Sequence, residues 1–341
     1  MTDSLRLIAI IALVCLTACT QPDDAAPSSF LERQDAGEFQ LRFMSWNVKF
    51  GSIFPPEGRR HVGFARIVRA VNPDVLILQE VNPREADRLA QMMDRIIPLG
   101  HSRLWEVHGS SDNVIISRYT LLQRDRELVV PHPLPSYSEF HNGQGMALVD
   151  LPDQLSDADL YVVAMHNRSR ASEKSIRERQ IQSDSIVRWL RALRGEKAIA
   201  EYTPMIVAGD MNVLASDPAL HLTTLLTGDI ADEETFGPDF SPDWDGTDLA
   251  DASPSHNARG EAFYTWRDDT EPFPPGQLSR ILFTDSVLSL QHGFVVNTVD
   301  MSPEELDRYG LREDDCLLDG KDGLFDHMPV VADFVLRQMT H

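Results

Sequence analysis

Five short segments of the chain each join an apolar run to polar side chains that could take part in catalysis. The segments are residues 44–47, 74–80, 162–167, 206–212 and 325–330. Their polar candidates are Asn47, Glu80, His166, Asp210, Asn212, Asp326 and His327. Because the end of a β-strand holds a side chain in a rigid position, we expect these groups to meet at one rim of a sheet structure.

Such a cluster would combine carboxylates, amides and imidazoles, with few thiols. Oxygen ligands of this kind suit Mg²⁺, with Mn²⁺ as a second choice. Asp210 and Asn212 lie two residues apart, which places both on one side if the strand continues. A metal site, a candidate base and neutral or cationic donors are what hydrolysis of a phosphoester needs.

Each candidate also has an ordinary structural explanation when taken alone. Asn47 could close a turn, Glu80 could cap the next helix and His166 could be a core histidine with its hydrogen bonds satisfied. Asp210 could belong to a turn after Gly209, and the Asp326-His327 pair could be part of a surface loop. The occurrence of all five segments in one chain favours a shared site.

The elements that must position these groups are mostly strands. Hydrophobic alternation and apolar runs predict strands at residues 39–44, 74–78, 114–116, 121–130, 146–149, 160–165, 205–208, 278–283, 287–296 and 328–336. Helical spacing predicts helices at residues 59–71, 84–97 and 172–193, and Asp217-Pro218-Ala219 is expected to open a short one. Residues 228–276 and 302–322 are expected to be irregular, the second as an acidic loop. Helices separate only some of the strands, which favours a layered α/β sandwich over a TIM barrel.

These segments resemble the motifs of the endonuclease/exonuclease/phosphatase superfamily, which includes deoxyribonuclease I, exonuclease III, neutral sphingomyelinases and inositol polyphosphate phosphatases. The matching motifs are Ser45-Trp46-Asn47, Pro73-Asp74-Val75 through Leu78-Gln79-Glu80-Val81, Asn113 to Arg118-Tyr119, Gly209-Asp210-Met211-Asn212 and Asp326-His327-Met328-Pro329-Val330. The resemblance covers about residues 38–337. It implies a deoxyribonuclease I-like fold: a four-layer α/β sandwich of two packed mixed β-sheets flanked by helices.

The resemblance also implies a role for each candidate. Asn47, Glu80 and Asp326 would hold the metal, with Glu80 its most direct ligand. Asp210 would orient or deprotonate the attacking water, and Asn212 would position that water and the phosphate. His166 and His327 would bind the scissile phosphate, and one of them would protonate the leaving oxygen.

Two positions depart from the family pattern. The segment before His166 is Ala164-Met165 instead of Asn-Thr. More seriously, Ser279 stands where the family carries an Asp that holds the last histidine. A hydroxyl cannot stabilise an imidazolium by charge, so the enzyme could be slow, could use another acid such as Asp251, or could be an inactive phosphate-binding protein that keeps the fold.

The overall charge bears on the substrate. The net charge is -22. The contents of hydrophobic residues (42%) and charged residues (25%) are those of an ordinary globular protein. Proteins that bind long nucleic acids gain affinity from Lys and Arg that replace counterions, and this chain has the opposite sign. We therefore expect a small molecule or a lipid headgroup as substrate rather than long nucleic acid. Substrate choice is expected to lie in residues 51–57, 131–145 and 228–276.

The N-terminus predicts export. Residues 7–18 form an apolar run of signal-peptide length, too short to span a bilayer. The run ends Leu16-Thr17-Ala18-Cys19, which resembles a bacterial lipobox with Cys19 as the lipidated residue; a plain signal peptide with a chance Cys is the alternative. We expect a signal peptide at 1–18, a flexible tether at 19–37 and one catalytic domain at 38–341. The protein would be a monomer anchored in the cell envelope, at the outer membrane or periplasmic face.

Overall fold

Two mixed β-sheets form the centre of the computed structural model, which describes residues 29–33, 40–50, 53–54, 58–100, 103–110, 112–124, 144–153, 158–214, 220–316 and 325–337. The seven-stranded sheet has the order β10-β12-β13-β1-β2-β4-β3 and the six-stranded sheet the order β5-β6-β7-β8-β11-β9. The strands of the first sheet are β1 (Gln40–Asn47), β2 (Val75–Gln79), β3 (Glu106–Ser110), β4 (Asn113–Ser117), β10 (Ser255–His256), β12 (Leu288–Val295) and β13 (Val330–Leu336). Those of the second are β5 (Leu121–Arg124), β6 (Gln144–Val149), β7 (Leu160–His166), β8 (Met205–Asp210), β9 (Ala250–Asp251) and β11 (Ser279–Phe283).

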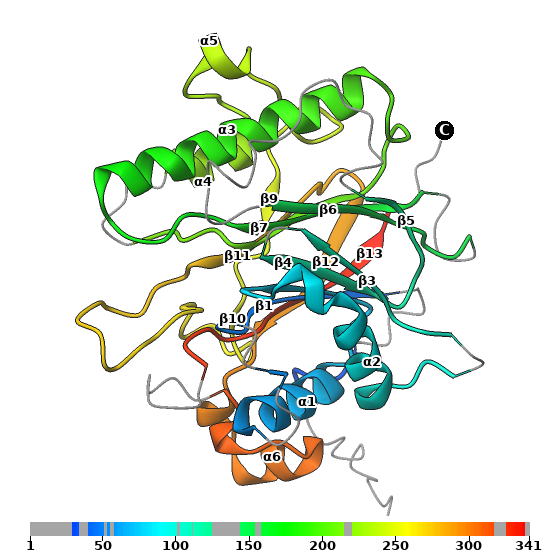
Figure 1. The fold of residues 1–341 in the computed structure, drawn as a ribbon, viewed down its shortest axis with the longest axis vertical. Helices are drawn as coiled ribbons and strands as arrows, with labels where there is room; N and C mark the ends of the chain where they lie inside the picture. Colours follow the sequence, from blue (N-terminus) through cyan, green and yellow to red (C-terminus); the bar gives the residue numbers. More distant parts are fainter. Residues whose placement is uncertain are drawn as a thin grey trace, which may run out of the picture.

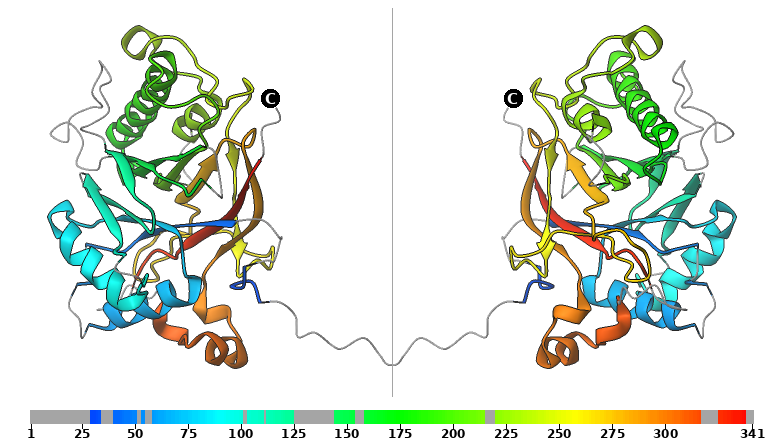
Figure 2. Two further views of the ribbon diagram at one scale, coloured as in Figure 1. Left: turned by 90° about the vertical axis from the view of Figure 1, so that its right-hand side faces the viewer. Right: turned by 90° about the vertical axis from the view of Figure 1, so that its left-hand side faces the viewer.

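Helices cover the outer faces of both sheets. The helices are α1 (Arg59–Val71), α2 (Ala86–Ile96), α3 (Glu173–Gly195), α4 (Leu220–Thr227), α5 (Glu233–Phe236) and α6 (Pro303–Tyr309). In Figure 1, α3 and α4 lie above the six-stranded sheet, while α1, α2 and α6 lie below the seven-stranded one. The two side views in Figure 2 show the same layers. The expected four-layer sandwich is therefore confirmed.

Three hydrophobic cores hold the layers together. Phe43, Ile77 and Val162 belong to the core between the sheets. A second core joins α1 and α2 to the seven-stranded sheet, and a third joins α3 to the six-stranded sheet. Full burial of one such side chain contributes about 1.5 to 3 kcal/mol, so the central core strongly stabilises the packing of the two sheets.

Helix α1 shows how closely local pattern and packing agree. It spans the predicted residues 59–71, and Phe64, Ile67 and Val68 are buried on its inner face. Val62, expected on that face, is instead 39% exposed. Helix α3 begins after Ser172, whose side chain accepts a hydrogen bond from the Ser175 backbone N–H.

Several expectations need correction. The acidic segment 302–322 is not simply a loop, because Ser302 and Glu305 form a capping box that starts α6. Residues 228–276 hold α5, β9 and β10, and the sequence pattern missed β3, whose residues are all half-buried. The predicted helix start at 217–219 and the strand segment 125–130 lie outside the described residues, as do residues 1–28, 51–52, 55–57 and 131–143.

Part of the predicted tether packs onto the domain. Phe30 and Leu31 are buried, and the Phe30 ring lies 5.1 Å from that of Phe294. The Leu31 carbonyl accepts a hydrogen bond from buried Arg42 at 2.7 Å. Burial of two apolar side chains explains why this stretch is not free. Within the described residues, no helix has the length and apolar character needed to cross a bilayer.

Candidate active site

The carboxyl ends of two parallel strand pairs face each other across the sandwich. In one sheet Asn47 pairs in register with Gln79, directly before Glu80, and in the other His166 pairs with Asp210. The Asn47 side-chain amide donates to Glu80 Oε1 at 3.0 Å and to Asp210 Oδ2 at 3.1 Å. One amide group therefore links the two sheets at this rim.

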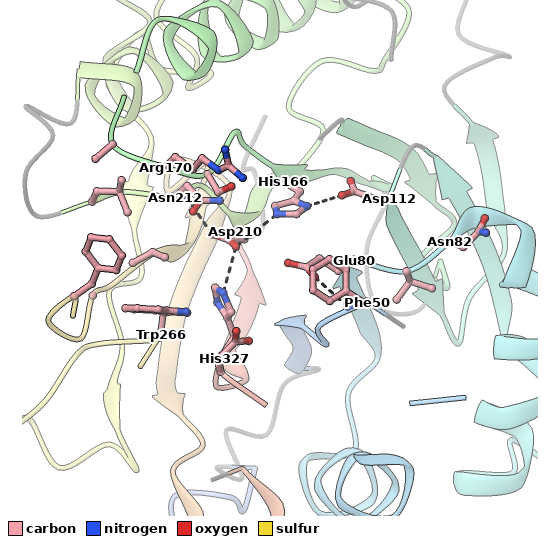
Figure 3. Close-up of a pocket in the computed structure, with 18 of the residues that line it drawn as sticks. Phe50, Glu80, Asn82, Asp112, His166, Arg170, Asp210, Asn212, Trp266 and His327 are labelled. Atoms are coloured by element: carbon pink, nitrogen blue, oxygen red, sulfur yellow. Dashed lines mark hydrogen bonds and ion pairs between the residues drawn. The ribbon is translucent and has the colours of Figure 1, made fainter. Parts of the chain in front are cut away.

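All seven candidate residues come together here. Six line a cavity of about 1460 Å³, and Asn47 contacts two of those six. The six are Glu80, His166, Asp210, Asn212, Asp326 and His327. Figure 3 shows the two imidazoles pointing toward the Asp210 carboxylate from opposite sides.

Gly209 explains why strand β8 can deliver Asp210 to this position. Its φ is +140°, and a Cβ atom there would lie 2.0 Å from the carbonyl oxygen of Met165 on β7. Only glycine permits this close approach of two backbones. In the Gly-Asp-Met-Asn motif, the glycine is thus required for steric reasons, and the aspartate contributes the chemical group.

Asp210 is the centre of the polar cluster. Its Oδ2 lies 3.5 Å from His327 Nε2 and 3.8 Å from His166 Nε2. Its Oδ1 accepts a hydrogen bond from the Asn212 backbone N–H at 3.1 Å. The side chain is 2% exposed, so its charge acts in a region of low dielectric constant. A carboxylate between two imidazoles can accept a proton from water or hold the imidazoles in charged form.

His166 has a partner that the sequence analysis missed. Its Nδ1 lies 2.7 Å from Asp112 Oδ2, on the turn before β4. Burial lowers the pKa of His166, but the hydrogen bond and charge of Asp112, with the charges of Asp210 and Glu80, outweigh burial and raise it to about 9. The imidazole is therefore a cation at neutral pH. The sequence feature that could have identified Asp112 is its position directly before the motif that begins at Asn113.

His327 is held through its backbone. Its carbonyl accepts a hydrogen bond from the indole N–H of Trp46 at 2.9 Å, and its backbone pairs with that of Trp266. Trp46 is fully buried and stacks on Phe64, which gives the tryptophan of the first motif a positioning role.

The ring of His327 lacks the orienting carboxylate that the family resemblance implies. Its Nδ1 and the Ser279 hydroxyl are both buried without a hydrogen-bond partner among the described residues. Asp251, the expected substitute, instead pairs with Arg280 at 2.9 Å. Asp251 therefore does not replace the missing carboxylate at His327.

Asn212 adopts a left-handed backbone with φ +51°. Its Nδ2 donates to the Asn167 carbonyl at 2.9 Å, and Asn167 N–H donates to the Asp210 carbonyl. These bonds fix the loop that follows β8. The side chain still faces the cavity and keeps a role in positioning a phosphate or water as a prediction.

The oxygen donors fit a hard divalent cation held mainly through Glu80. Glu80 has φ +61° and places its half-buried carboxylate in the cavity beside the Asn47 amide. Mg²⁺ commonly binds through one or two carboxylates and keeps several waters. Within the described residues no three His, Cys, Asp or Glu side chains are grouped as a complete metal site. Asp326, the third predicted ligand, pairs with Lys49 at 2.9 Å, a cation that the sequence analysis also missed.

Arg118, from the third motif, and Cys316 lie away from this chemistry. Arg118 Nε donates to the Pro73 carbonyl at 2.7 Å, so the Arg118-Tyr119 motif ties β4 to the start of β2. Cys316 is buried and its Sγ contacts the Val296 carbonyl at 3.0 Å. Burial raises the pKa of its thiol to about 12, which makes it an ineffective nucleophile.

Comparison with known proteins agrees with the observed fold. The sequence model of the Endonuclease/Exonuclease/phosphatase family matches residues 44–302. No curated protein matches the chain. Truncated Caenorhabditis elegans TDP2 has a similar structure, with a TM-score of 0.54 and 15% identity over 87% of this chain and 98% of its own. ANGEL2, a 2′,3′-cyclic phosphatase in complex with adenosine-2′,3′-vanadate, has a TM-score of 0.54 and 14% identity over 88% and 97%. The human Nocturnin catalytic domain with bound sulfate has a TM-score of 0.51 and 15% identity over 87% and 95%.

Proposed function

Because the chain belongs to the endonuclease/exonuclease/phosphatase family, we propose that it is a phosphoester hydrolase that uses a divalent cation and an activated water. One observation carries the proposal: buried Asp210 lies between two imidazoles and shares the Asn47 amide with Glu80. This arrangement supports the proposal, because a candidate base, a candidate cation and a carboxylate suited to a divalent ion surround one space. The solved structures of similar fold include a phosphatase, which supports the same class of reaction.

Each group has a role that follows from its position. His166, held as a cation by Asp112, binds a non-bridging oxygen of the phosphate. Asp210 accepts a hydrogen bond from the attacking water and takes its proton as the phosphorus–oxygen bond forms. His327, on the other side of Asp210, donates to the phosphate or to the leaving oxygen. A divalent cation at Glu80, when bound, supplies further charge neutralisation at the phosphate, with Mg²⁺ favoured and Mn²⁺ as a substitute.

The substrate we favour is a small phosphoester or a lipid headgroup. The net charge of -22 opposes the approach of a long polyanion. We also propose that a lipid on Cys19 anchors a monomeric protein in the cell envelope, on the basis of the Leu16-Thr17-Ala18-Cys19 pattern. Labelling with a radioactive fatty acid, compared between wild type and Cys19→Ser, tests the anchor separately from the activity.

A simple activity assay tests the hydrolase. Purified protein should release 4-nitrophenol from bis(4-nitrophenyl) phosphate with Mg²⁺, and excess chelator should stop the reaction. Asp210→Ala should lower kcat by about 10² or more, the range for loss of a general base. Asp307→Ala, an exposed acid on α6, is the matched control and should keep wild-type activity. Equal activity with chelator, or in Asp210→Ala, contradicts the proposal.

The unpartnered Ser279 hydroxyl and His327 Nδ1 favour a second candidate, a phosphate-binding protein with little or no catalysis. Calorimetry separates the two candidates. Vanadate or phosphate that binds with Mg²⁺, in a protein that hydrolyses no ester in a broad screen, would assign the binding function instead.

A further inference from the structure

Two phenylalanine rings lie exposed at the cavity that holds Asp210. Phe50 is 83% exposed and Phe273 is 61% exposed, and both line the cavity. Neither ring gains much from folding, since the hydrophobic effect rewards only burial. Apolar side chains gathered at the edge of a polar pocket commonly mark a binding surface.

Phe50 is held in the open by its backbone. Lys49 and Phe50 both adopt left-handed conformations, with φ +49° and +56°. The Phe50 N–H donates to Glu80 Oε2 at 3.0 Å, and Lys49 pairs with Asp326 at 2.9 Å. Successive strained residues persist only where the surroundings impose them. The site's own carboxylates therefore hold the backbone that presents the exposed ring.

Phe273 lies on a loop that is rooted in the other side of the site. Trp266 pairs with Gly276 at the base of the loop and with His327. Phe273 is flanked by Pro272, Pro274 and Pro275, which restrict the backbone of the exposed segment. In Figure 1 this gold loop projects from the sheets at the left of the view. Figure 3 shows Phe50 and Trp266 on opposite sides of the group formed by Asp210 and its two imidazoles.

The charges of the cavity limit what else the substrate can carry. Its lining includes four carboxylates but only two guanidinium groups. The carboxylates are those of Glu80, Asp112, Asp210 and Asp326, and the guanidinium groups are those of Arg84 and Arg170. His166 and a bound divalent cation add positive charge to the cavity, but the carboxylates and the scissile phosphate itself match that charge. An uncharged substituent needs no further cation and could pack on an exposed ring.

Resting on the proposed hydrolase function, we propose that the substrate is a phosphodiester whose scissile phosphate carries an uncharged apolar or aromatic substituent. Phe50 and Phe273, on opposite sides of the polar cluster, are then specificity-determining residues that bind the organic groups on the two sides of the scissile phosphate. They touch the substrate but take no part in proton transfer.

Two diesters with the same leaving group test the proposal. Bis(4-nitrophenyl) phosphate keeps an aromatic ring on the phosphate after the leaving group, and methyl 4-nitrophenyl phosphate keeps only a methyl group. The ratio of their kcat/KM values is compared between wild type and variants, so intrinsic reactivity cancels. Loss of the ring that packs on the retained group, in Phe50→Ala or in Phe273→Ala, should lower the ratio about three- to tenfold, chiefly through KM, and the double variant should lower it at least as far.

Phe263→Ala is the matched control, since Phe263 is 43% exposed and does not line the cavity. It should leave the ratio unchanged. Dihexanoyl phosphatidylcholine below its micellar concentration provides a third arm. If hydrolysis of this lipid also depends on the two rings, they recognise acyl chains; if only the aryl diester does, they recognise aromatic groups.

The outcomes separate the two proposals. If wild-type protein hydrolyses no diester, the hydrolase function itself fails. If it hydrolyses both diesters, but the ratio in the double variant equals that of wild type, the specificity assignment is overturned while the hydrolase function stands. A ratio that falls equally in Phe263→Ala also overturns the assignment, because the effect would then not belong to the cavity.

Discussion

The side-chain amide of Asn47, at the end of β1, donates to the Asp210 carboxylate at the end of β8, 3.1 Å away and in the opposite sheet. The same amide donates to Glu80. The amide therefore holds two carboxylates close together, and its hydrogen bonds stabilise the negative charge of both. The chemistry of the site depends on this contact between the two sheets.

Asn47→Ala should disturb both the site and the fold. Loss of two hydrogen bonds leaves Asp210 and Glu80 less well compensated, so the free energy of unfolding should fall by about 1 to 3 kcal/mol. Mg²⁺ affinity should fall about tenfold or more, as for loss of a residue that orients a ligand. Urea unfolding and Mg²⁺ titration of thermal stability measure the two effects. Unchanged values for both would show that the amide link is unimportant.

Asp112→Asn should change the pH profile. Above a pKa of about 9, His166 loses its proton, so a rate that needs the imidazolium should fall as the pH rises through that value. Without the Asp112 charge the pKa of His166 drops, and the alkaline fall in kcat should move to lower pH. Rates between pH 6 and 10 test this. Asp307→Asn is the control, and an identical alkaline limb in Asp112→Asn would contradict the assigned pairing.

Ser279→Asp should supply the missing orienting group. Ser279 N–H donates to the Thr265 hydroxyl and Met328 N–H to the Thr265 carbonyl, so position 279 lies close to the backbone that carries His327. A carboxylate there would accept a hydrogen bond from His327 Nδ1, and kcat should rise about tenfold. In the control Ser279→Asn, the side chain has nearly the same shape as Asp but no charge. Its kcat should rise less than about threefold. A lower kcat in Ser279→Asp would indicate that repulsion with Asp210, its register partner, dominates.

Gly209→Ala should fail sterically. A Cβ 2.0 Å from the Met165 carbonyl oxygen forces β7 and β8 apart, and the free energy of unfolding should fall by at least about 3 kcal/mol. Gly195, at the end of α3, has no atom within 4 Å of an added Cβ. Gly195→Ala should therefore stay within about 1 kcal/mol of wild type. Equal stability of the two variants, measured by urea unfolding, would show that the strands tolerate the side chain.

The local sequence was enough to predict most of the helices and strands and to single out seven polar residues that meet at one rim. Helix α1 begins and ends where its hydrophobic spacing predicts, and the apolar runs before Asn47, Glu80, His166 and Asp210 are strands. The cause is local, since periodicity and strand propensity depend on neighbours in the chain. The capping box at Ser302 is an equally local signal that the pattern of acidic residues concealed.

Only the tertiary structure decided which groups meet. Asp112 contacts His166 because β4 and β7 pack face to face, although the two residues lie 54 positions apart. Asn47 reaches Asp210 across 163 positions, and Asp251 turns to Arg280 instead of His327. The same packing brings the exposed rings of Phe50 and Phe273 to one cavity. Contacts of this kind depend on the registry of two sheets through a shared core, and no local pattern encodes that registry.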